Sequence, residues 1–285
     1  MAGDDREDLT VIGNRRFWKM TGSGNDFVFI DGRDGSAGEF QKPATIQRIC
    51  ARGTGVGADG LVILSAPTVA GADLALTYYN ADGSLAALCG NATLCTASLA
   101  ARLGVVDPAG FGIQTGTGVL RARIRDGLPE FDLPGIREPL AAFAPVAMEG
   151  SEQRLGFATA GIPHVVISVA DVALADVANR GRSVRYDASL PEGANVNFVS
   201  PTAPGRWKIR TYERGVEGET LACGTGCVAT ALMLEAWGEA DGDVELETAS
   251  GRTLGVRSVR AADGSWTASL RGEGRLVFEG ELREI

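Results

Sequence analysis

Two cysteines in this sequence each stand directly before the start of a predicted helix. Cys89, followed by Gly90, precedes an Ala- and Leu-rich stretch (91–104), and Cys223 precedes a similar stretch (225–238). A thiol at a helix N-terminus feels the positive end of the helix dipole, so we expect its pKa to fall toward neutrality. The free N–H groups of the first helical turn can bind an anion. Each turn is therefore expected to offer one reactive thiol and one site for a carboxylate.

The other cysteines, Cys50, Cys95 and Cys227, are interpreted as packing residues. Cys95 and Cys227 fall one to two turns inside the predicted helices, where a free thiol behaves as a small apolar side chain. The chain has five cysteines and no C-x-x-C motif, so neither a disulfide framework nor a zinc site is expected. One Cys-Gly pair at a helix start is usually a packing feature, but two pairs at matched places favour a shared chemical role.

The two cysteine turns belong to an internal duplication of the sequence. Four segments recur in the same order, with offsets that fall from 137 to 133 residues: GNDFVFI and GIPHVVI, GADGLVI and GANVNFV, LCGNATLCTASL and ACGTGCVATALM, QTGTGVL and ETASGRTL. Chance similarity explains one such pair far more easily than four in one order. We therefore expect two copies of one domain, with the cysteine turns facing each other across a pseudo-twofold axis.

Each copy is expected to fold as strands around one helix. The hydrophobic pattern predicts an entry strand, a helix, two further strands, a Gly-rich turn, the helix after the cysteine, and late strands. This predicts an α/β (α+β) fold of two pseudo-symmetric duplicated domains, each a curved, mostly antiparallel sheet or barrel around a central helix. We expect the first domain in residues 1–133 with a return strand at 270–285, the second in residues 134–269, and the active site in the cleft between them.

The composition is that of a globular protein, because 45% of the 285 residues are hydrophobic and 22% are charged. The net charge of −9 argues against nucleic acid or an anionic membrane as a partner, because both bind basic surfaces. The N-terminal sequence MAGDDREDLT is acidic, unlike a secretory signal, and no stretch approaches twenty uninterrupted apolar residues. We therefore expect a cytoplasmic protein.

Motifs for the common cofactors are missing from the sequence. The lysines, Lys19, Lys42 and Lys208, do not stand in a Gly-rich loop that opens a helix, which argues against pyridoxal phosphate chemistry. No G-x-G-x-x-G follows a predicted strand, and no G-x-x-x-x-G-K-[ST] occurs. We expect no cofactor and no metal ion.

Two thiols on opposite faces of one bound molecule suit the inversion of a stereocentre. One thiolate removes a proton from one face while one thiol returns a proton to the other, and the roles exchange with the direction of reaction. The α-proton of an amino acid is weakly acidic, so its carbanion and aci-carboxylate must be stabilised. Backbone N–H groups at the two helix starts would supply this stabilisation, from Gly90, Asn91, Gly224 and Thr225.

Several longer segments extend this pattern from Phe17 to the C-terminus: KMTGSGNDFVFID, GVGADGLVIL, YYNADGSLAALCGN, GIPHVVI, LPEGANVNFV, RTYERGVEGETLACGTG and LVFEGEL. In these segments the chain resembles diaminopimelate epimerase. The resemblance implies cofactor-independent epimerisation of LL-2,6-diaminopimelate to meso-diaminopimelate, in lysine and peptidoglycan precursor synthesis. It assigns the two catalytic thiols to Cys89 and Cys223.

The resemblance also implies contacts to the distal amino-acid head of the substrate. Asn80 and Asn195 would bind this head, and Arg214 would pair bidentately with its carboxylate. Taken without the resemblance, both asparagines are more simply turn residues. Without the resemblance, Arg214 could equally be a solvated surface charge.

Further contacts are implied around the reacting carbon. Asn25 would line the site, Glu213 would lie near the reacting ammonium, and His164 would orient groups or exchange protons near the thiols. The reacting carboxylate would be held by Gly90, Asn91, Gly224 and Thr225. His164 alone would be interpreted as a structural histidine, because Pro163 before it fixes a turn.

Two other functions stay open. A racemase or epimerase of another amino acid on the same fold would not be expected to keep Asn80 and Arg214 together. A non-catalytic amino-acid-binding protein would have no need of both thiols. Ile162 stands where the family usually has an asparagine, which leaves the substrate range open. The expected partner is a small-molecule amino acid, and a homodimer is also open.

Overall fold

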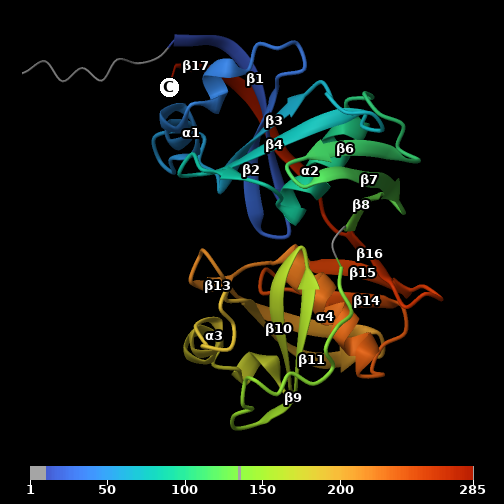
Figure 1. Cartoon of the computed structure of the whole chain (residues 1–285). Helices are drawn as coiled ribbons and strands as arrows, with labels where there is room; N and C mark the ends of the chain where they lie inside the picture. Colours follow the sequence, from blue (N-terminus) through green and yellow to red (C-terminus); the bar gives the residue numbers. More distant parts are fainter. Residues whose placement is uncertain (1–10, 134–135, 285) are drawn as a thin grey trace, which may run out of the picture.

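Each half of the chain forms one lobe in the computed structural model, and strands connect the two lobes (Figure 1). The structure describes residues 11–133 and 136–284. The acidic N-terminal stretch and residue 134, where the second domain is predicted to begin, lie outside the described residues. Within the described ranges, no helix is long and apolar enough to cross a membrane.

The elements follow one another in nearly the same order in both halves. The first half contains β1 (Val11–Gly22), β2 (Asn25–Asp31), η1 (Gly38–Gln41), α1 (Pro43–Cys50), β3 (Gly60–Ser65), β4 (Leu74–Asn80), β5 (Leu85–Ala86), α2 (Gly90–Arg102), β6 (Phe111–Thr115), β7 (Gly118–Arg125) and β8 (Leu128–Leu133). The second half contains β9 (Glu152–Ala160), β10 (Ile162–Val169), η2 (Val172–Leu174), α3 (Val177–Arg185), β11 (Asn195–Ala203), β12 (Arg206–Glu213), β13 (Gly218–Thr220), α4 (Gly224–Ala236), β14 (Asp243–Glu247), β15 (Thr253–Arg260) and β16 (Trp266–Arg271). The strand β17 (Arg275–Glu284) follows.

Strand pairing repeats between the halves, which confirms the duplication inferred from the sequence. In the first half β2–β3 and β4–β6 are parallel, and their counterparts β10–β11 and β12–β14 are parallel too. The other described pairs are antiparallel, such as β3–β4 and its counterpart β11–β12. The prediction of two duplicated, mostly antiparallel α/β domains is therefore confirmed.

The last two strands connect the lobes (Figure 1). β16 pairs with β15 on one side and with β8 on the other, where Leu270 lies opposite Phe131. β17 pairs antiparallel with β1, and Arg15 lies opposite Leu282. The sequence analysis expects a return strand at 270–285 in the first domain; in the structure β17 pairs with β1 of the first lobe, and β16 pairs with strands of both lobes. The domain boundaries at residues 133 and 269 stay a prediction.

The central helices α2 and α4 are buried on almost every side. A helix with apolar residues all round belongs in a protein interior, and one core cluster contains side chains of both helices. Each helix ends at a glycine in the left-handed conformation, Gly104 (φ +68°) and Gly238 (φ +73°). The N–H groups of these glycines bond back to the helix carbonyls of Ala101 and Glu235. Both helix ends agree with the sequence prediction.

The N-termini of α2 and α4 approach each other closely. A Cβ placed on Gly90 would lie 3.7 Å from the Cα of Gly224, and a Cβ on Gly224 would lie 3.7 Å from the Cα of Gly90. Leu270 of β16 packs against both turns, because its Cδ2 would lie 3.3 Å and 2.8 Å from these two Cβ positions. Glycine at both positions therefore allows the two first turns to meet against one leucine.

Replacing Leu270 with alanine should destabilise the whole molecule. Leu270 is fully buried, so its truncation leaves a cavity where the helices meet, and the free energy of unfolding should fall by about 2–5 kcal/mol. Denaturant unfolding measures this change. Val259→Ala, at an exposed position of β15, is the matched control and should change the free energy of unfolding by less than about 0.5 kcal/mol. Equal effects of the two variants would contradict the packing argument.

Candidate active site

Cys89 and Cys223 occupy the same position in the two lobes. Each is the N-cap residue of its helix, with extended backbone angles of φ −134°, ψ 118° for Cys89 and φ −124°, ψ 107° for Cys223. Neither side chain makes a capping hydrogen bond, and both thiols are free. The two cysteines thus stand at the starts of helices whose first turns contact each other at Gly90 and Gly224.

Both thiols are protonated at neutral pH. Burial raises the pKa of Cys89 to about 11 and that of Cys223 to about 12. Backbone amides of the first helical turn favour the thiolates, those of Ala92 and Asn91 at Cys89 and that of Gly226 at Cys223, but their effect on the pKa is smaller. The expectation of lowered thiol pKa values is therefore wrong, because desolvation by burial raises each pKa by more than the helix N-terminus lowers it.

Glu213, the last residue of β12, acts on both thiols. Its charge raises the pKa of Cys89 and that of Cys223, so its carboxylate lies near both cysteines. Burial raises the pKa of Glu213 itself, against a hydrogen bond in which the hydroxyl of Thr220 donates to Oε2 at 2.8 Å. Glu213 thus links the two lobes electrostatically at the predicted site.

Asn25 and Asn91 lie together in the first lobe. The side-chain amide of Asn91 donates to Oδ1 of Asn25 at 2.6 Å, and the amide of Asn25 donates to Asp59 at 3.1 Å. Asn91 is the second residue after Cys89, so these contacts place Asn25 beside the first turn of α2. The sequence analysis overlooked Asp59, although the duplication aligns it in GADGLVI with Asn195 in GANVNFV.

Asn195 connects Cys223 to Arg214 in the second lobe. Its Nδ2 lies 3.5 Å from the sulfur of Cys223, and its Oδ1 accepts the backbone N–H of Arg214 at 2.9 Å. The hydroxyl of Thr225 also lies 3.5 Å from this sulfur. The guanidinium of Arg214 donates to the carbonyl of Glu192 at 2.8 Å. Asn195, Arg214, Cys223 and Thr225 therefore form one contact group.

Asn80 makes local contacts at the end of β4. Its side-chain amide donates to the hydroxyl of Ser84 at 2.9 Å, and its backbone N–H donates to the carbonyl of Ser84 at 2.9 Å. These are the contacts of a turn between β4 and β5. No described hydrogen bond joins Asn80 to the other predicted site residues, so its role in substrate binding stays a prediction.

His164 of β10 is fully buried, and burial together with the charge of Arg214 lowers its pKa to about 3. Its Nδ1 lies 3.2 Å from Nδ2 of Asn197, which also donates to the carbonyl of Val165 at 3.1 Å. Nδ1 must therefore accept, so a neutral ring carries its proton on Nε2. Nε2 is buried and has no partner within the described residues.

The sequence analysis also overlooked Asn197. It stands two residues after Asn195 on β11, so both side chains point to the same face of the strand. The spacing in NVNF was the signal that could have identified it.

The remaining cysteines are buried as predicted. Cys50, Cys95 and Cys227 lie in the hydrophobic clusters of the two lobes. Burial raises the pKa of each thiol above its usual value, to about 11 for Cys50. They have the surroundings of packing residues.

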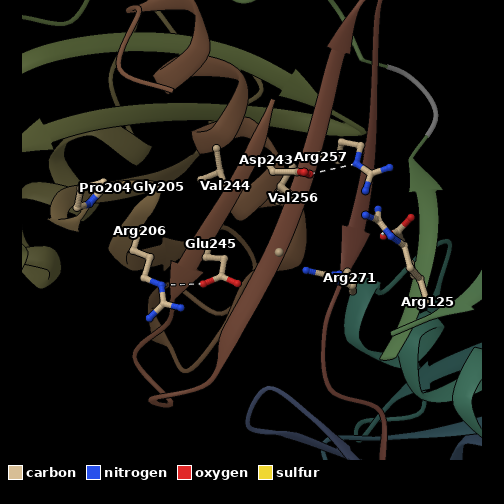
Figure 2. A pocket seen from close by; sticks show the side chains of 12 residues that line it. Arg125, Pro204, Gly205, Arg206, Asp243, Val244, Glu245, Val256, Arg257 and Arg271 are labelled. Carbon is tan, nitrogen blue, oxygen red and sulfur yellow. Dashed lines mark hydrogen bonds and ion pairs between the residues drawn. The ribbon is translucent and has the colours of Figure 1, made fainter. Parts of the chain in front are cut away.

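A separate hollow of about 380 Å³ lies between strands of the two lobes (Figure 2). Its described lining includes none of the residues predicted to act on the substrate. Figure 2 shows Arg206 paired with Glu245 and Arg257 paired with Asp243, at 3.0 Å and 3.1 Å. Because these cations are already neutralised by carboxylates, the hollow does not present an evident anion site.

The chain is similar to known proteins over most of its length. The sequence profile of diaminopimelate epimerase matches residues 17–130 and 156–270, one segment in each lobe. A diaminopimelate epimerase of Gemmatimonas aurantiaca is 49% identical to this chain, over 93% of this chain and 98% of the relative. One of Aquifex aeolicus is 36% identical, over 94% of this chain and 98% of the relative.

Solved structures with low sequence identity share the fold. A PhzF-family phenazine biosynthesis protein of Bacillus anthracis has a TM-score of 0.70 at 16% identity, and the match covers 94% of this chain and 99% of that protein. A probable proline racemase of Agrobacterium radiobacter has a TM-score of 0.66 at 16% identity, over 94% of this chain and 92% of that protein.

Alkylation of the substrate-free protein should be slow at neutral pH and should accelerate with pH. Because the pKa of Cys89 is about 11, its thiolate fraction and its rate with iodoacetamide should rise about tenfold per pH unit between pH 7 and 9. Cys89 is more exposed than Cys223 and should be labelled first. Peptide mass spectrometry measures both rates, with Cys89→Ala as control. A rate that levels off near pH 8 would contradict the raised pKa.

His164 should make the protein less stable as the pH falls. The folded chain holds this imidazole neutral down to about pH 3, whereas the unfolded chain binds a proton near pH 6.5, so stability is lost between these values. Between pH 7 and pH 5 the wild type should lose about 2 kcal/mol more unfolding free energy than His164→Gln. Denaturant unfolding at both pH values measures the difference. Parallel losses in both proteins would show that His164 is not held neutral.

Proposed function

The chain belongs to the diaminopimelate epimerase family, and we propose that it converts LL-2,6-diaminopimelate to the meso form with two thiols, Cys89 and Cys223. The reaction is an isomerisation, and in this family it serves lysine and peptidoglycan precursor synthesis. The observation that carries the assignment of the thiols is their equivalence: both are N-cap residues of helices whose first turns touch.

The proposed mechanism inverts one α-carbon between two thiols. The thiolate on one face takes the α-proton: an S–H bond forms, the C–H bond breaks, and the electron pair passes into the conjugated carboxylate. The thiol on the other face then gives its proton to the carbon, so that its S–H bond breaks and a new C–H bond forms. The protonation states of Cys89 and Cys223 have exchanged at the end, and the reverse reaction restores them.

The helix N-termini would stabilise the developing negative charge. The backbone N–H groups of Gly90, Asn91, Gly224 and Thr225 are in the first turns of α2 and α4, where no intrahelical carbonyl is available to them. A substrate carboxylate bound there would gain hydrogen bonds and the field of both dipoles, and these strengthen as the aci-carboxylate forms.

Burial raises the pKa of both thiols, which makes either cysteine a strong base in its thiolate form. A thiol with a raised pKa yields a strongly basic thiolate, which suits removal of a weakly acidic proton. One thiol would give up its proton to solvent as the substrate binds, because the substrate ammonium group brought near the sulfur favours the thiolate. Glu213 near both thiols would pair with that ammonium.

Recognition of the distal head would rest on the side chains after β4 and β12. Asn80 and Arg214 stand at equivalent ends of these strands, and Asn195 binds the backbone of Arg214. The guanidinium of Arg214 would pair with the distal carboxylate in two parallel hydrogen bonds. Ile162, the counterpart of Asn25 in the duplication, leaves the contacts around the reacting carbon to the other polar groups.

Removing either thiol should abolish epimerisation. Cys89→Ala and Cys223→Ala should each lower turnover of LL-2,6-diaminopimelate by at least about 100-fold, because one face loses its proton carrier. In deuterium oxide the wild type should place solvent deuterium at the inverted α-carbon, which nuclear magnetic resonance detects. Cys50→Ala removes a buried thiol outside the site and should keep most activity. A single thiol variant with more than a tenth of wild-type turnover would refute the two-thiol mechanism.

A further inference from the structure

The side-chain carbonyl of Asn91 is buried without a hydrogen-bond partner. Asn91 is 3% exposed, and Oδ1 makes no hydrogen bond within the described residues, while Nδ2 donates to Asn25 at 2.6 Å. A buried acceptor without a donor costs stability. Such a group beside a catalytic cysteine is suited to a donor supplied by a ligand.

The orientation of this carbonyl is set by a carboxylate two contacts away. Asp59 accepts hydrogen bonds through both oxygens, so it can face only the NH₂ side of Asn25. Oδ1 of Asn25 then faces Asn91, so Asn91 must donate a hydrogen bond to it from its own NH₂ group. The side-chain carbonyl of Asn91 therefore points away from Asn25 and keeps its capacity to accept a hydrogen bond. Turning either amide around would bring two oxygens, or two NH₂ groups, face to face.

Asp59 is itself held in place by charges. Arg52 lies 2.8 Å from Oδ1 of Asp59 and 2.7 Å from Asp26, and Lys19, a buried cation, lies 2.7 Å from Asp26. Burial raises the pKa of Asp26, but the hydrogen bonds from Arg52 and Lys19 outweigh it and hold this pKa at about 2. The backbone N–H of Asp26 donates to Oδ2 of Asp59 at 3.1 Å. The carboxylate of Asp59 is therefore fixed from both sides.

This group of residues lies where the two lobes meet. The β1–β2 turn before Asn25 packs against the second lobe, because a Cβ on Gly24 would lie 2.9 Å from Ser250 and 3.1 Å from Leu221. Leu221 stands two residues before Cys223, and Asn91 stands two residues after Cys89. The oriented amides thus lie near the contact between the two lobes.

The positions of the second lobe that align with Asn25 and Asn91 carry no side-chain amide. The duplication aligns Asn25 with Ile162 and Asn91 with Thr225, so an apolar side chain replaces the first amide and a hydroxyl replaces the second. Both lobes offer N–H groups at a helix start, but the oriented carbonyl belongs to the first lobe. A substrate that presents one carboxylate and one ammonium at the reacting carbon would therefore be held in one orientation.

We propose that Asp59 is a positioning residue that, through Asn25, presents the carbonyl of Asn91 to the ammonium group on the reacting carbon of the substrate. This inference rests on the proposed function, because it assumes an amino-acid substrate at Cys89 and Cys223. Asp59 touches no reacting atom. Its effect is to decide whether the position beside Cys89 accepts or donates a hydrogen bond.

Asp59→Asn tests the proposal, because an amide of the same shape can present either a donor or an acceptor to Asn25. The KM for LL-2,6-diaminopimelate should rise about tenfold with kcat within threefold of the wild type, since the contact exists before and during proton transfer. L-2-aminopimelate, which keeps the distal head but lacks the reacting ammonium, should inhibit the variant and the wild type with constants that agree within twofold.

Two further variants complete the experiment. Asp31→Asn removes a carboxylate at the other end of β2, where Asp31 pairs with Arg33 at 2.7 Å, and should leave KM and the inhibition constant unchanged. Arg52→Gln releases one side of Asp59 and should raise KM in the same direction, and it decides the question if Asp59→Asn does not fold. An equal loss for both ligands, a fall in kcat at constant KM, or no change would overturn the proposal. A wild type that leaves LL-2,6-diaminopimelate unchanged would instead refute the proposed function.

Discussion

The structure depends on holding the positive ends of two helix dipoles together in the interior. α2 and α4 meet at Gly90 and Gly224, and the first turn of each helix has N–H groups without intrahelical partners. Like partial charges at this separation repel, and surroundings of low dielectric strengthen the repulsion. A bound carboxylate removes it. The close packing of the two helix N-termini therefore favours binding of an anion between the lobes.

The helix dipoles favour the thiolate forms of the two cysteines, but burial in the same interior disfavours them. Cys223 is buried and Cys89 is partly buried, and the resulting loss of solvation raises each thiol pKa by more than the nearby amides lower it. Buried neighbours such as Glu213 and His164 are kept closer to neutral for the same reason. At neutral pH the two thiols and His164 are therefore uncharged, and an entering zwitterion supplies the positive charge that favours a thiolate.

Features set by neighbouring residues could be predicted from the sequence, and features set by distant contacts could not. The helices after Cys89 and Cys223 and their ends at Gly104 and Gly238 follow from local patterns, and the duplication predicted the repeated strands. The direction of the thiol pKa shifts was missed because burial depends on strands far away in the chain. The orientation of the Asn91 amide depends on Asp59 through Asn25, and the residues next to Asn91 in the sequence do not determine it.

The pairing of β17 with β1 has a consequence for folding during synthesis on the ribosome. Arg15 lies opposite Leu282, so the outer edge of β1 stays uncovered until residues 275–284 have left the exit tunnel. The first lobe, although synthesised first, cannot complete its sheet before the second lobe exists. Contacts that are so distant in sequence slow folding, and they leave a strand edge open to pairing with other chains until synthesis is nearly finished.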